Sequence, residues 1–290
     1  MFKTKPFVAE KVWGYERWLV STHRAGVAQI EGEDEAIETR TGAYPLLIKV
    51  IQADQTLSVQ VHPDDAYAQE HENSAGKSEC WYILDAAPDS AIVYGLNGRY
   101  SREELETAIN EQRLEQCLRS VPVAKGDFVF IPAGTVHAIQ GGLRLLEVQQ
   151  PSDVTYRLYD WGRPREVHVQ KGLDVIKQED TPLEPERPFS GRFVCPYFSL
   201  ARYDITIGST CLFISPFDLR GRADIDIDFK TPATKRKWYS FFILSGSGLL
   251  ISSDGNKIAV KPEDCVMVHI EERLSIIPDE GTVLSVMAIG

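Results

Sequence analysis

Residues 58–82 read SVQVHPDDAYAQEHENSAGKSECWY, and two short alternating segments within them concentrate side chains that bind metals. In the first segment, Gln60 and His62 are two residues apart in a run rich in valine. Residues two apart on a β-strand point to the same face, so an amide oxygen and an imidazole can converge on one point. In the second segment, Lys77 and Glu79 have the same spacing, which predicts a cation and a carboxylate on one strand face.

A second imidazole is available at His137, which follows the turn-like sequence Pro132-Ala133-Gly134. We therefore predict that His137 is the first residue of a strand. Two nitrogens and two oxygens, one of them charged, suit zinc or another first-row divalent ion. They leave a position open for water or a substrate oxygen, as in catalytic metal sites. The predicted donors are Gln60, His62, Glu79 and His137.

Each of these residues has an ordinary structural alternative. A histidine beside a proline, as His62 is beside Pro63, is more often a surface or hydrogen-bonded residue than a metal ligand. His137 taken alone is no stronger a candidate. The combination Q-x-H-P, K-x-E and P-x-G-x-x-H, each at the edge of a predicted strand, favours a metal site because packing does not require it.

Composition limits the possible functions of the chain. Of its 290 residues, 43% are hydrophobic and 25% are charged, which is ordinary for a soluble globular protein. The net charge of −11 argues against nucleic acid or an anionic membrane as a partner. An anionic substrate would need a local cationic pocket, for which Lys77 and Arg157 are the candidates. The amino terminus has no apolar signal region and no stretch approaches the roughly 18 apolar residues of a membrane span, so we expect a cytoplasmic protein.

Short β runs separated by turn residues dominate the chain. Ser101-Arg102-Glu103-Glu104 has the capping-box pattern, which predicts a helix running to about Leu118. Residues 178–188, QEDTPLEPERP, are acidic and proline-rich and favour a domain boundary. Regularly spaced β runs beyond them are typical of a sandwich or barrel.

We predict a mainly β fold of two cupin-type jelly-roll β-barrels. Residues 1–180 form a metal-binding catalytic domain with a helical insertion around residues 101–118. Residues 181–290 form a second β-barrel without metal.

Two further strands carry candidate site residues. Residues 143–150 read as a strand with Glu147 and Gln149 on one face. Residues 155–161, TYRLYDW, read as another, on which Arg157 is flanked by aromatic residues. Such an arginine is a candidate oxyanion or phosphate clamp, although an arginine stacked for structural reasons is about equally common. Trp13 is expected in the core or in a pocket wall.

Four motifs, taken in order, resemble the type I mannose-6-phosphate isomerases in their short bacterial form. They are LSVQVHPDD at 57–65, GKSECWYILD at 76–85, FIPAGTVHAI at 130–139 and LEVQQPSDVTYRLYDWGR at 146–163. The resemblance covers roughly residues 40–170 in register. It implies a zinc-dependent aldose–ketose isomerase, an intramolecular oxidoreductase that interconverts mannose 6-phosphate and fructose 6-phosphate through an enediol.

The resemblance also implies roles for individual residues. Lys77 and Arg157 match positions for catalysis and substrate binding, and Glu147 falls at an acidic position of the active-site strand. Trp13 is counted with Lys77 and Arg157 as a substrate-binding residue. One Zn²⁺ per chain is expected, and the zinc ligands of the family match Gln60, His62, Glu79 and His137.

The chemistry of the reaction fits these residue types. Moving a carbonyl between C1 and C2 requires a proton transfer and places charge on adjacent oxygens. A divalent metal can stabilise that charge as a Lewis acid. Arg157 would stabilise the same charge or clamp the phosphate, and Lys77 would add a donor. Glu147, Lys77 and a metal-bound water stay open as the group that moves the proton.

Three other functions fit parts of the pattern. An iron dioxygenase of the cupin type is disfavoured, because Gln60 stands where such sites prefer a second histidine. A non-enzymatic sugar-phosphate-binding cupin sensor is disfavoured by the intact set of metal-ligand candidates. An isomerase of another aldose stays open. The expected partner is a small sugar phosphate, with no nucleic acid and no membrane, and the expected assembly is a monomer or weak homodimer.

Overall fold

A computed structural model of the chain describes residues 1–178, 180–206 and 237–290. The described residues are mainly β, with several antiparallel sheets and few helices, which confirms the predicted class at that level. The chain divides into two compact units. Unit 1 comprises Met1–Phe7, Trp18–Leu46 and Ser190–Gly290, and unit 2 comprises Val8–Arg17 and Leu47–Phe189.

This division differs from the predicted boundary between residues 180 and 181. Strand β1 (Phe2–Lys5) pairs with β21 (Cys265–His269), which joins the start of the chain to unit 1. Glu186, in the predicted linker, forms a β-bridge with Phe128 of unit 2. Glu179 of the same linker lies outside the described residues. Both pairings join residues far apart in sequence, and local sequence patterns do not predict such pairings.

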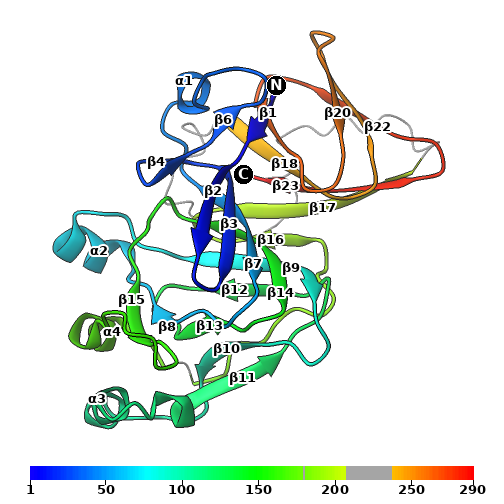
Figure 1. The fold of residues 1–290 in the computed structure, drawn as a ribbon. Coiled ribbons are helices and arrows are strands. Elements are labelled where there is room, and N and C mark those ends of the chain that lie inside the picture. The colour runs from blue at the N-terminus through cyan, green and yellow to red at the C-terminus, as the bar shows by residue number, and fades with distance from the viewer. Residues whose placement is uncertain (179, 207–236) are drawn as a thin grey trace. The chain divides into compact units, whose positions relative to one another are not determined.

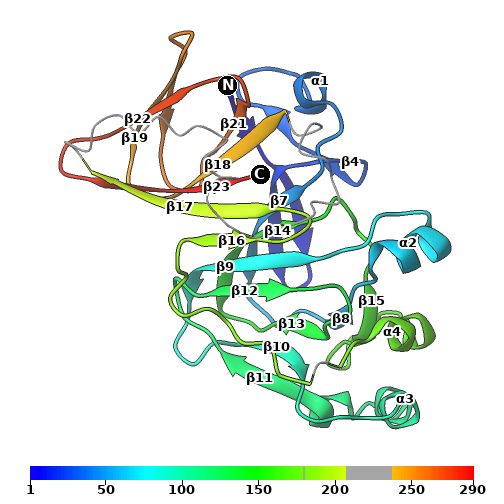
Figure 2. The ribbon, with the colours of Figure 1, turned by 180° about the vertical axis from the view of Figure 1, so that it is seen from behind.

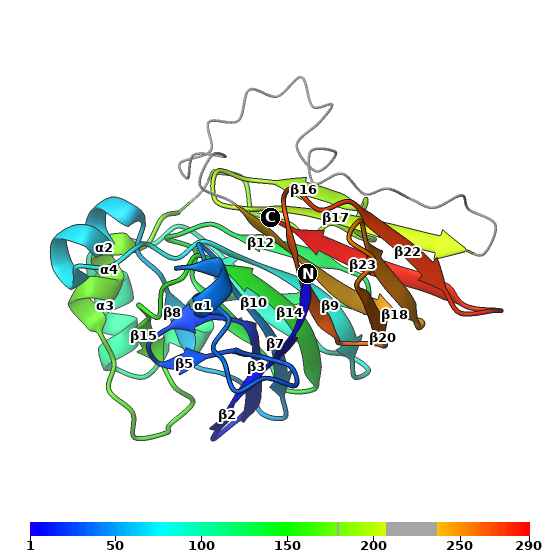
Figure 3. The same ribbon diagram turned by 90° about the horizontal axis from the view of Figure 1, so that it is seen from above.

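Unit 1 contains, in its described part, a seven-stranded sheet in the order β16-β17-β23-β18-β21-β1-β6 and a three-stranded sheet in the order β20-β19-β22. Side chains from both sheets form one apolar core. Figure 3 shows β17, β23 and β18 side by side. The remaining elements are β4 (Thr22–His23), β5 (Gly26–Val27), β6 (Gln29–Ile30), α1 (Glu38–Thr41), β16 (Arg192–Val194), β17 (Ser199–Thr206), β18 (Trp238–Ser245), β19 (Gly248–Ser252), β20 (Lys257–Val260), β22 (Leu274–Pro278) and β23 (Val283–Ile289).

Unit 2 is built on a five-stranded sheet in the order β11-β10-β13-β8-β15 and on a six-stranded sheet in the order β12-β9-β14-β7-β3-β2, counted over the residues described. Its strands are β2 (Phe7–Lys11), β3 (Gly14–Val20), β7 (Leu47–Ala53), β8 (Val59–Val61), β9 (Glu79–Ala86), β10 (Ala91–Leu96), β11 (Leu118–Pro122), β12 (Phe128–Ile131), β13 (His137–Ile139), β14 (Leu143–Gln149) and β15 (Tyr156–Tyr159). Figure 2 shows β9 beside β12, and β10 beside β11.

Alternation along the strands gives the five-stranded sheet two distinct faces. On β10, Ile92 and Tyr94 belong to a core shared with the six-stranded sheet. Val93 between them packs instead in a second core with α3 (Arg102–Asn110) and α4 (Val169–Val175). Helices α3, α4 and α2 (Asp65–Glu72) therefore lie together on one side of unit 2 (Figure 1). The other face of the five-stranded sheet, the inner face, packs against the six-stranded sheet.

Helix α3 begins where the sequence predicts but ends earlier. Asp64 caps α2 by accepting a hydrogen bond from the Tyr67 amide (3.2 Å), and Ser101 caps α3 in the predicted capping box. The prediction that this helix reaches about Leu118 is wrong. Gln112 has a left-handed φ of 55°, and the chain continues as a 3₁₀ turn, η1 (Leu114–Cys117), and then as β11. None of the helices in the described ranges is long and apolar enough to span a membrane.

Candidate metal centre

The candidate site lies where the inner faces of unit 2 change from apolar to polar side chains. On β14, Leu143 and Leu145 belong to the apolar core, and the next residues on that face are Glu147 and Gln149. Gln149 pairs in register with Glu79, the first residue of β9. All three polar residues are buried. Because side chains alternate along a strand, they point into the same interior as the core.

Three residues of the five-stranded sheet occupy the opposing inner face. The register places Arg157 of β15 opposite Gln60 of β8, and Gln60 opposite His137 of β13. Their sequence neighbours Val61 and Ala138 pack in the outer core with the helices. Gln60, His137 and Arg157 therefore point towards the six-stranded sheet. His137 begins its strand, as predicted.

His62, Glu79 and His137 form a compact cluster. One potential ligand atom from each residue lies within 4.8 Å of the others. His62 Nε2 is 3.6 Å from Glu79 Oε2, and His137 Nε2 is 3.4 Å from Glu79 Oε1. Two ligands of a tetrahedral zinc, each about 2.0–2.1 Å from the ion, are themselves about 3.3 Å apart. The spacing of the cluster is therefore close to that of ligands sharing one ion.

Backbone carbonyls fix the orientation of both imidazoles. His62 Nδ1 donates to the Val154 carbonyl (3.0 Å), and His137 Nδ1 donates to the Thr135 carbonyl (2.9 Å). A carbonyl only accepts, so each Nδ1 carries the proton and each Nε2 presents a lone pair. Burial lowers the pKa of His62, helped by the charge of Lys77, and lowers the pKa of His137 to about 4. Both rings are therefore neutral at pH 7, the form that binds metals.

The Glu79 carboxylate is fully buried. Lys77 Nζ pairs with Oε2 at 2.9 Å, whereas Oε1 has no hydrogen-bond partner among the described residues. Burial, together with the charge of Glu147, raises the pKa of Glu79 to about 7 against the opposite effect of Lys77. Lys77 compensates only part of the buried negative charge, since Glu147 adds a second carboxylate, and buried charges are costly unless cations balance them. The donor set of Glu79 and two neutral histidines therefore fits a divalent ion.

Gln60 and Lys77 donate to the imidazole lone pairs of the cluster. Gln60 Nε2 lies 3.3 Å from His137 Nε2, and Lys77 Nζ lies 3.1 Å from His62 Nε2. The predicted ligand atom of Gln60 is its amide oxygen, whereas the amide nitrogen faces His137 here. Rotation about the last side-chain torsion exchanges these two atoms. The structure thus brings all four predicted ligand residues together, with Lys77 beside them.

A second network of buried charges runs across the six-stranded sheet beside the cluster. Trp81, Glu147 and Lys49 are directly opposed in register on β9, β14 and β7. Trp81 Nε1 donates to Glu147 Oε2 (3.0 Å), and Lys49 Nζ lies 2.9 Å from Glu147 Oε1 and 3.9 Å from Glu16 Oε2. Burial opposes both charges, but their attraction outweighs it, so the pKa of Lys49 is raised and the pKa of Glu147 is lowered. We predicted no role for Lys49 from the sequence. Its position as a lysine within the otherwise apolar residues 44–52 is the feature that could have indicated one.

Replacing Lys49 by methionine is expected to lower the free energy of unfolding by about 3–5 kcal/mol, because Glu147 would be left as an uncompensated buried charge. Equilibrium unfolding in urea measures this loss. The double variant Lys49→Met/Glu147→Gln should recover most of it, since no unpaired charge is left behind. If the double variant instead lost as much free energy of unfolding as Lys49→Met and Glu147→Gln lose together, the two groups would not interact.

Arg157, on β15, belongs to a cationic group that continues into the loop after that strand. Its Nη1 donates to the Glu166 carbonyl (2.6 Å), and its buried Nε has no hydrogen-bond partner among the described residues. Arg163 and Arg165 both donate to the buried carboxylate of Asp160. Burial, followed by the charge of Arg165, lowers the pKa of Arg157. Three arginines with Asp160 and Glu166 leave one net positive charge. Of the three arginines, only Arg157 was predicted from the sequence.

Trp13 lies in the apolar core of unit 2. Its side chain is 5% exposed and packs in the cluster that contains Ile51 and Trp81. Its carbonyl accepts hydrogen bonds from the amides of Asp54 (2.8 Å) and Gln55 (3.0 Å). This packing agrees with the core alternative, and a substrate-binding role for Trp13 stays a prediction.

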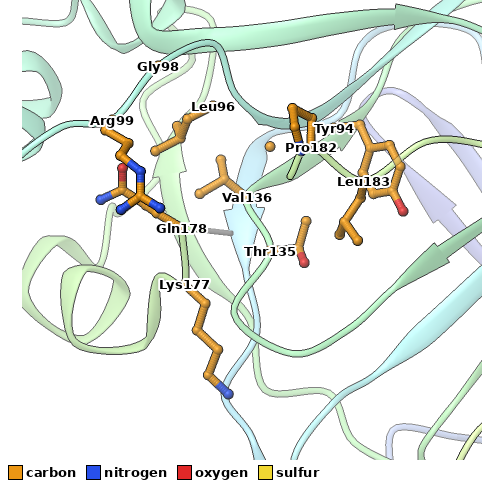
Figure 4. Close-up of a pocket in the computed structure, with 11 residues that line it drawn as sticks. Tyr94, Leu96, Gly98, Arg99, Thr135, Val136, Lys177, Gln178, Pro182 and Leu183 are labelled. Atoms are coloured by element: carbon orange, nitrogen blue, oxygen red, sulfur yellow. The ribbon is translucent and has the colours of Figure 1, made fainter. Parts of the chain in front are cut away.

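A small pocket adjoins the loop that precedes His137. It has a volume of about 70 Å³ and is lined by Thr135, Val136 and Leu183, among others (Figure 4). Lys177 extends away from these residues in Figure 4 and pairs with Asp64 (3.0 Å). Ligand sites usually enclose about 300–1,000 Å³, so this pocket is too small for a sugar phosphate.

A family model and curated relatives of this chain agree on one family. The family model "Phosphomannose isomerase type I, catalytic domain" matches residues 25–85. Mannose-6-phosphate isomerase ManA of Bacillus subtilis is 39% identical over 231 residues, which cover 73% of this chain and 67% of ManA. Mannose-6-phosphate isomerase of Streptococcus mutans is 40% identical over 182 residues, covering 56% of this chain and 57% of that protein.

Solved structures extend the similarity over the whole chain. The mannose 6-phosphate isomerase of Bacillus subtilis superposes with a TM-score of 0.79 at 26% identity, covering 100% of this chain and 99% of that one. A mannose 6-phosphate isomerase bound with zinc and yttrium superposes with a TM-score of 0.66 at 15% identity, covering 100% and 98% of the two chains. At 15% identity, the similarity to this zinc- and yttrium-bound protein shows a shared fold and nothing more.

Proposed function

Because this chain belongs to the type I phosphomannose isomerase family, we propose that it interconverts mannose 6-phosphate and fructose 6-phosphate with a zinc ion held by four residues. The family and the enzyme class predicted from the sequence are confirmed by the comparisons. The single observation that carries the metal site is the buried Glu79 carboxylate, which lies between two imidazole lone pairs and has one oxygen, Oε1, without a hydrogen-bond partner among the described residues. The zinc in a related isomerase supports the choice of metal. The four residues are Gln60, His62, Glu79 and His137.

The charges around the cluster support a divalent cation and an anionic substrate. Glu16, Glu79 and Glu147 carry three negative charges when ionised, and Lys49 and Lys77 carry two positive charges. One net negative charge is left when both histidines are neutral. Adding a divalent ion changes the total to one positive charge, which attracts an anion in a low-dielectric interior.

The chain supplies the other elements of an aldose–ketose isomerisation. When bound, a divalent ion would act as a Lewis acid towards the sugar carbonyl. Lys77 adds an ammonium donor beside it, and Arg157 lies one strand away on the same inner face. Glu147 is kept ionised by Lys49 and Trp81, so it can accept a proton as the enediol forms. The excess positive charge of Arg157, Arg163 and Arg165 favours binding of the phosphate group.

We place this chemistry in unit 2 and assign a supporting role to unit 1. In the described part of each unit, a larger and a smaller sheet share one apolar core between them. This pairing supports the proposal that each is a barrel of the cupin type. The metal-ligand candidates all lie in unit 2.

A coupled assay of mannose 6-phosphate consumption tests the proposed function. We expect turnover by the protein as purified, its loss after treatment with a chelator, and its return on adding Zn²⁺, because the proposed reaction needs a Lewis acid that the side chains of the cluster do not supply. Elemental analysis of the same samples should give one zinc per chain. Binding of mannose 6-phosphate without turnover would favour a sugar-phosphate sensor, and faster turnover of another aldose would change the substrate.

A further inference from the structure

The turn that follows β14 is held from the inside by the side chain of Gln149. Its Nε2 donates to the carbonyls of Gln150 (2.9 Å) and Ser152 (2.7 Å). The Ser152 amide also donates to the Gln150 carbonyl (2.7 Å), and the Val154 amide donates to Ser152 Oγ (3.3 Å). Gln149 and Ser152 are 0% and 1% exposed. The two N–H groups of one buried amide therefore set the path of residues 150–154.

This turn reaches both sides of the metal cluster. At its end, the Val154 carbonyl accepts the Nδ1 proton of His62. At its start, Gln150 Oε1 accepts a hydrogen bond from the amide of Ser78 (2.8 Å), the residue between Lys77 and Glu79. The Gln150 amide in turn donates to the Ser78 carbonyl (3.2 Å). A shift of the turn would therefore move an imidazole and the start of the strand that carries the carboxylate.

We propose that Gln149 is a positioning residue of the metal site, acting through the 150–154 turn on the ring of His62. The amide fixes the turn, the turn fixes the Val154 carbonyl, and that carbonyl keeps His62 Nε2 directed at Glu79. Hydrogen-bond partners that orient a metal-binding histidine commonly change metal affinity by about 10–100-fold when removed. The inference rests on the proposed metal-dependent function.

The side chain at position 149 must supply two donors and no charge. A carboxylate there could not donate to the two carbonyls, and it would stand directly opposite Glu79 in the strand register. Methionine has a similar length and no hydrogen-bond donor, so Gln149→Met removes the clamp with little change in volume. Gln52→Met is the matched control, because Gln52 is a strand amide of the same sheet whose Nε2 donates to Asp54 (3.0 Å).

The test compares metal binding by the full-length chain in the parent, Gln149→Met and Gln52→Met. Zinc affinity is measured by competition with a chromogenic chelator, ligand geometry by the visible spectrum of the Co²⁺-loaded protein, and stability by the melting temperature of the metal-free protein. We expect Gln149→Met to bind zinc about 10–100-fold more weakly and to shift the cobalt spectrum. The loss of zinc affinity and the change in the cobalt spectrum should exceed what the fall in melting temperature accounts for, which a merely structural role of Gln149 would not predict.

A second variant tests the same path without changing Gln149. Ser152→Ala removes the Oγ that accepts the Val154 amide, so it should weaken zinc binding in the same direction by a smaller factor. If Gln149→Met does not fold, this variant decides the question. Unchanged affinity in Ser152→Ala, or an unchanged cobalt spectrum in Gln149→Met, would overturn the proposal. A parent protein that binds neither zinc nor cobalt would instead overturn the proposed function itself.

Discussion

Glu79→Gln is expected to remove bound zinc and to lower kcat/KM by about 10³-fold, the scale of losing electrostatic stabilisation of the transition state. The substitution keeps the shape of the side chain and removes its charge. Two neutral imidazoles and two amides would then be left to hold a divalent ion in an interior that also contains the Lys77 ammonium. Zinc content by elemental analysis and turnover in the coupled assay measure the two effects.

Glu147→Gln is the matched control for that substitution. Glu147 is also a buried glutamate on the inner face, but its carboxylate interacts with Trp81 and Lys49 rather than with the histidines. This variant should keep its zinc and lose turnover. If Glu79→Gln retained a full complement of zinc, the cluster would not be the metal site, whatever the activity.

The strand alternation in the sequence predicted much of the candidate site. Side chains two apart on a strand must share a face, so Gln60 with His62 and Lys77 with Glu79 could be paired before any tertiary information was available. The position of His137 at a strand start followed from the turn before it. These inferences depend only on residues close together in the sequence. In the structure, the residues they identified lie together.

Features that depend on pairing between distant strands could not be predicted in the same way. The row of Trp81, Glu147 and Lys49 exists only because β9, β14 and β7 are neighbours in one register. The role of Gln149 depends on a turn whose carbonyls converge on its amide. The helix from Ser101 stops early at a left-handed residue, and i,i+4 apolar spacing does not reveal such a stop.

The second large effect is expected at Arg157, where Arg157→Ala should retain zinc and lower kcat by about 10²–10³-fold. Arg157 directly opposes Gln60 in the strand register, so its side chain leaves the strand on the inner face, and its Nη1 donates to the Glu166 carbonyl rather than to a proposed ligand. Its buried Nε has no hydrogen-bond partner in the described part of the chain. An unsatisfied buried donor is stabilised when an anion reaches it, and the enediolate oxygens and the phosphate are both anionic.

Arg157→Lys and Arg102→Ala separate the possible causes of that loss. Lysine keeps the charge without the planar pair of donors, so its activity should fall between those of the parent and Arg157→Ala. Arg102, exposed on α3 and paired with Asp174, should have no effect when replaced. A loss confined to KM would identify Arg157 as a phosphate clamp, since binding of the substrate and of the transition state would weaken equally. Loss of zinc from Arg157→Ala would mean that the arginine supports the ligand strands, and full activity would remove it from the site.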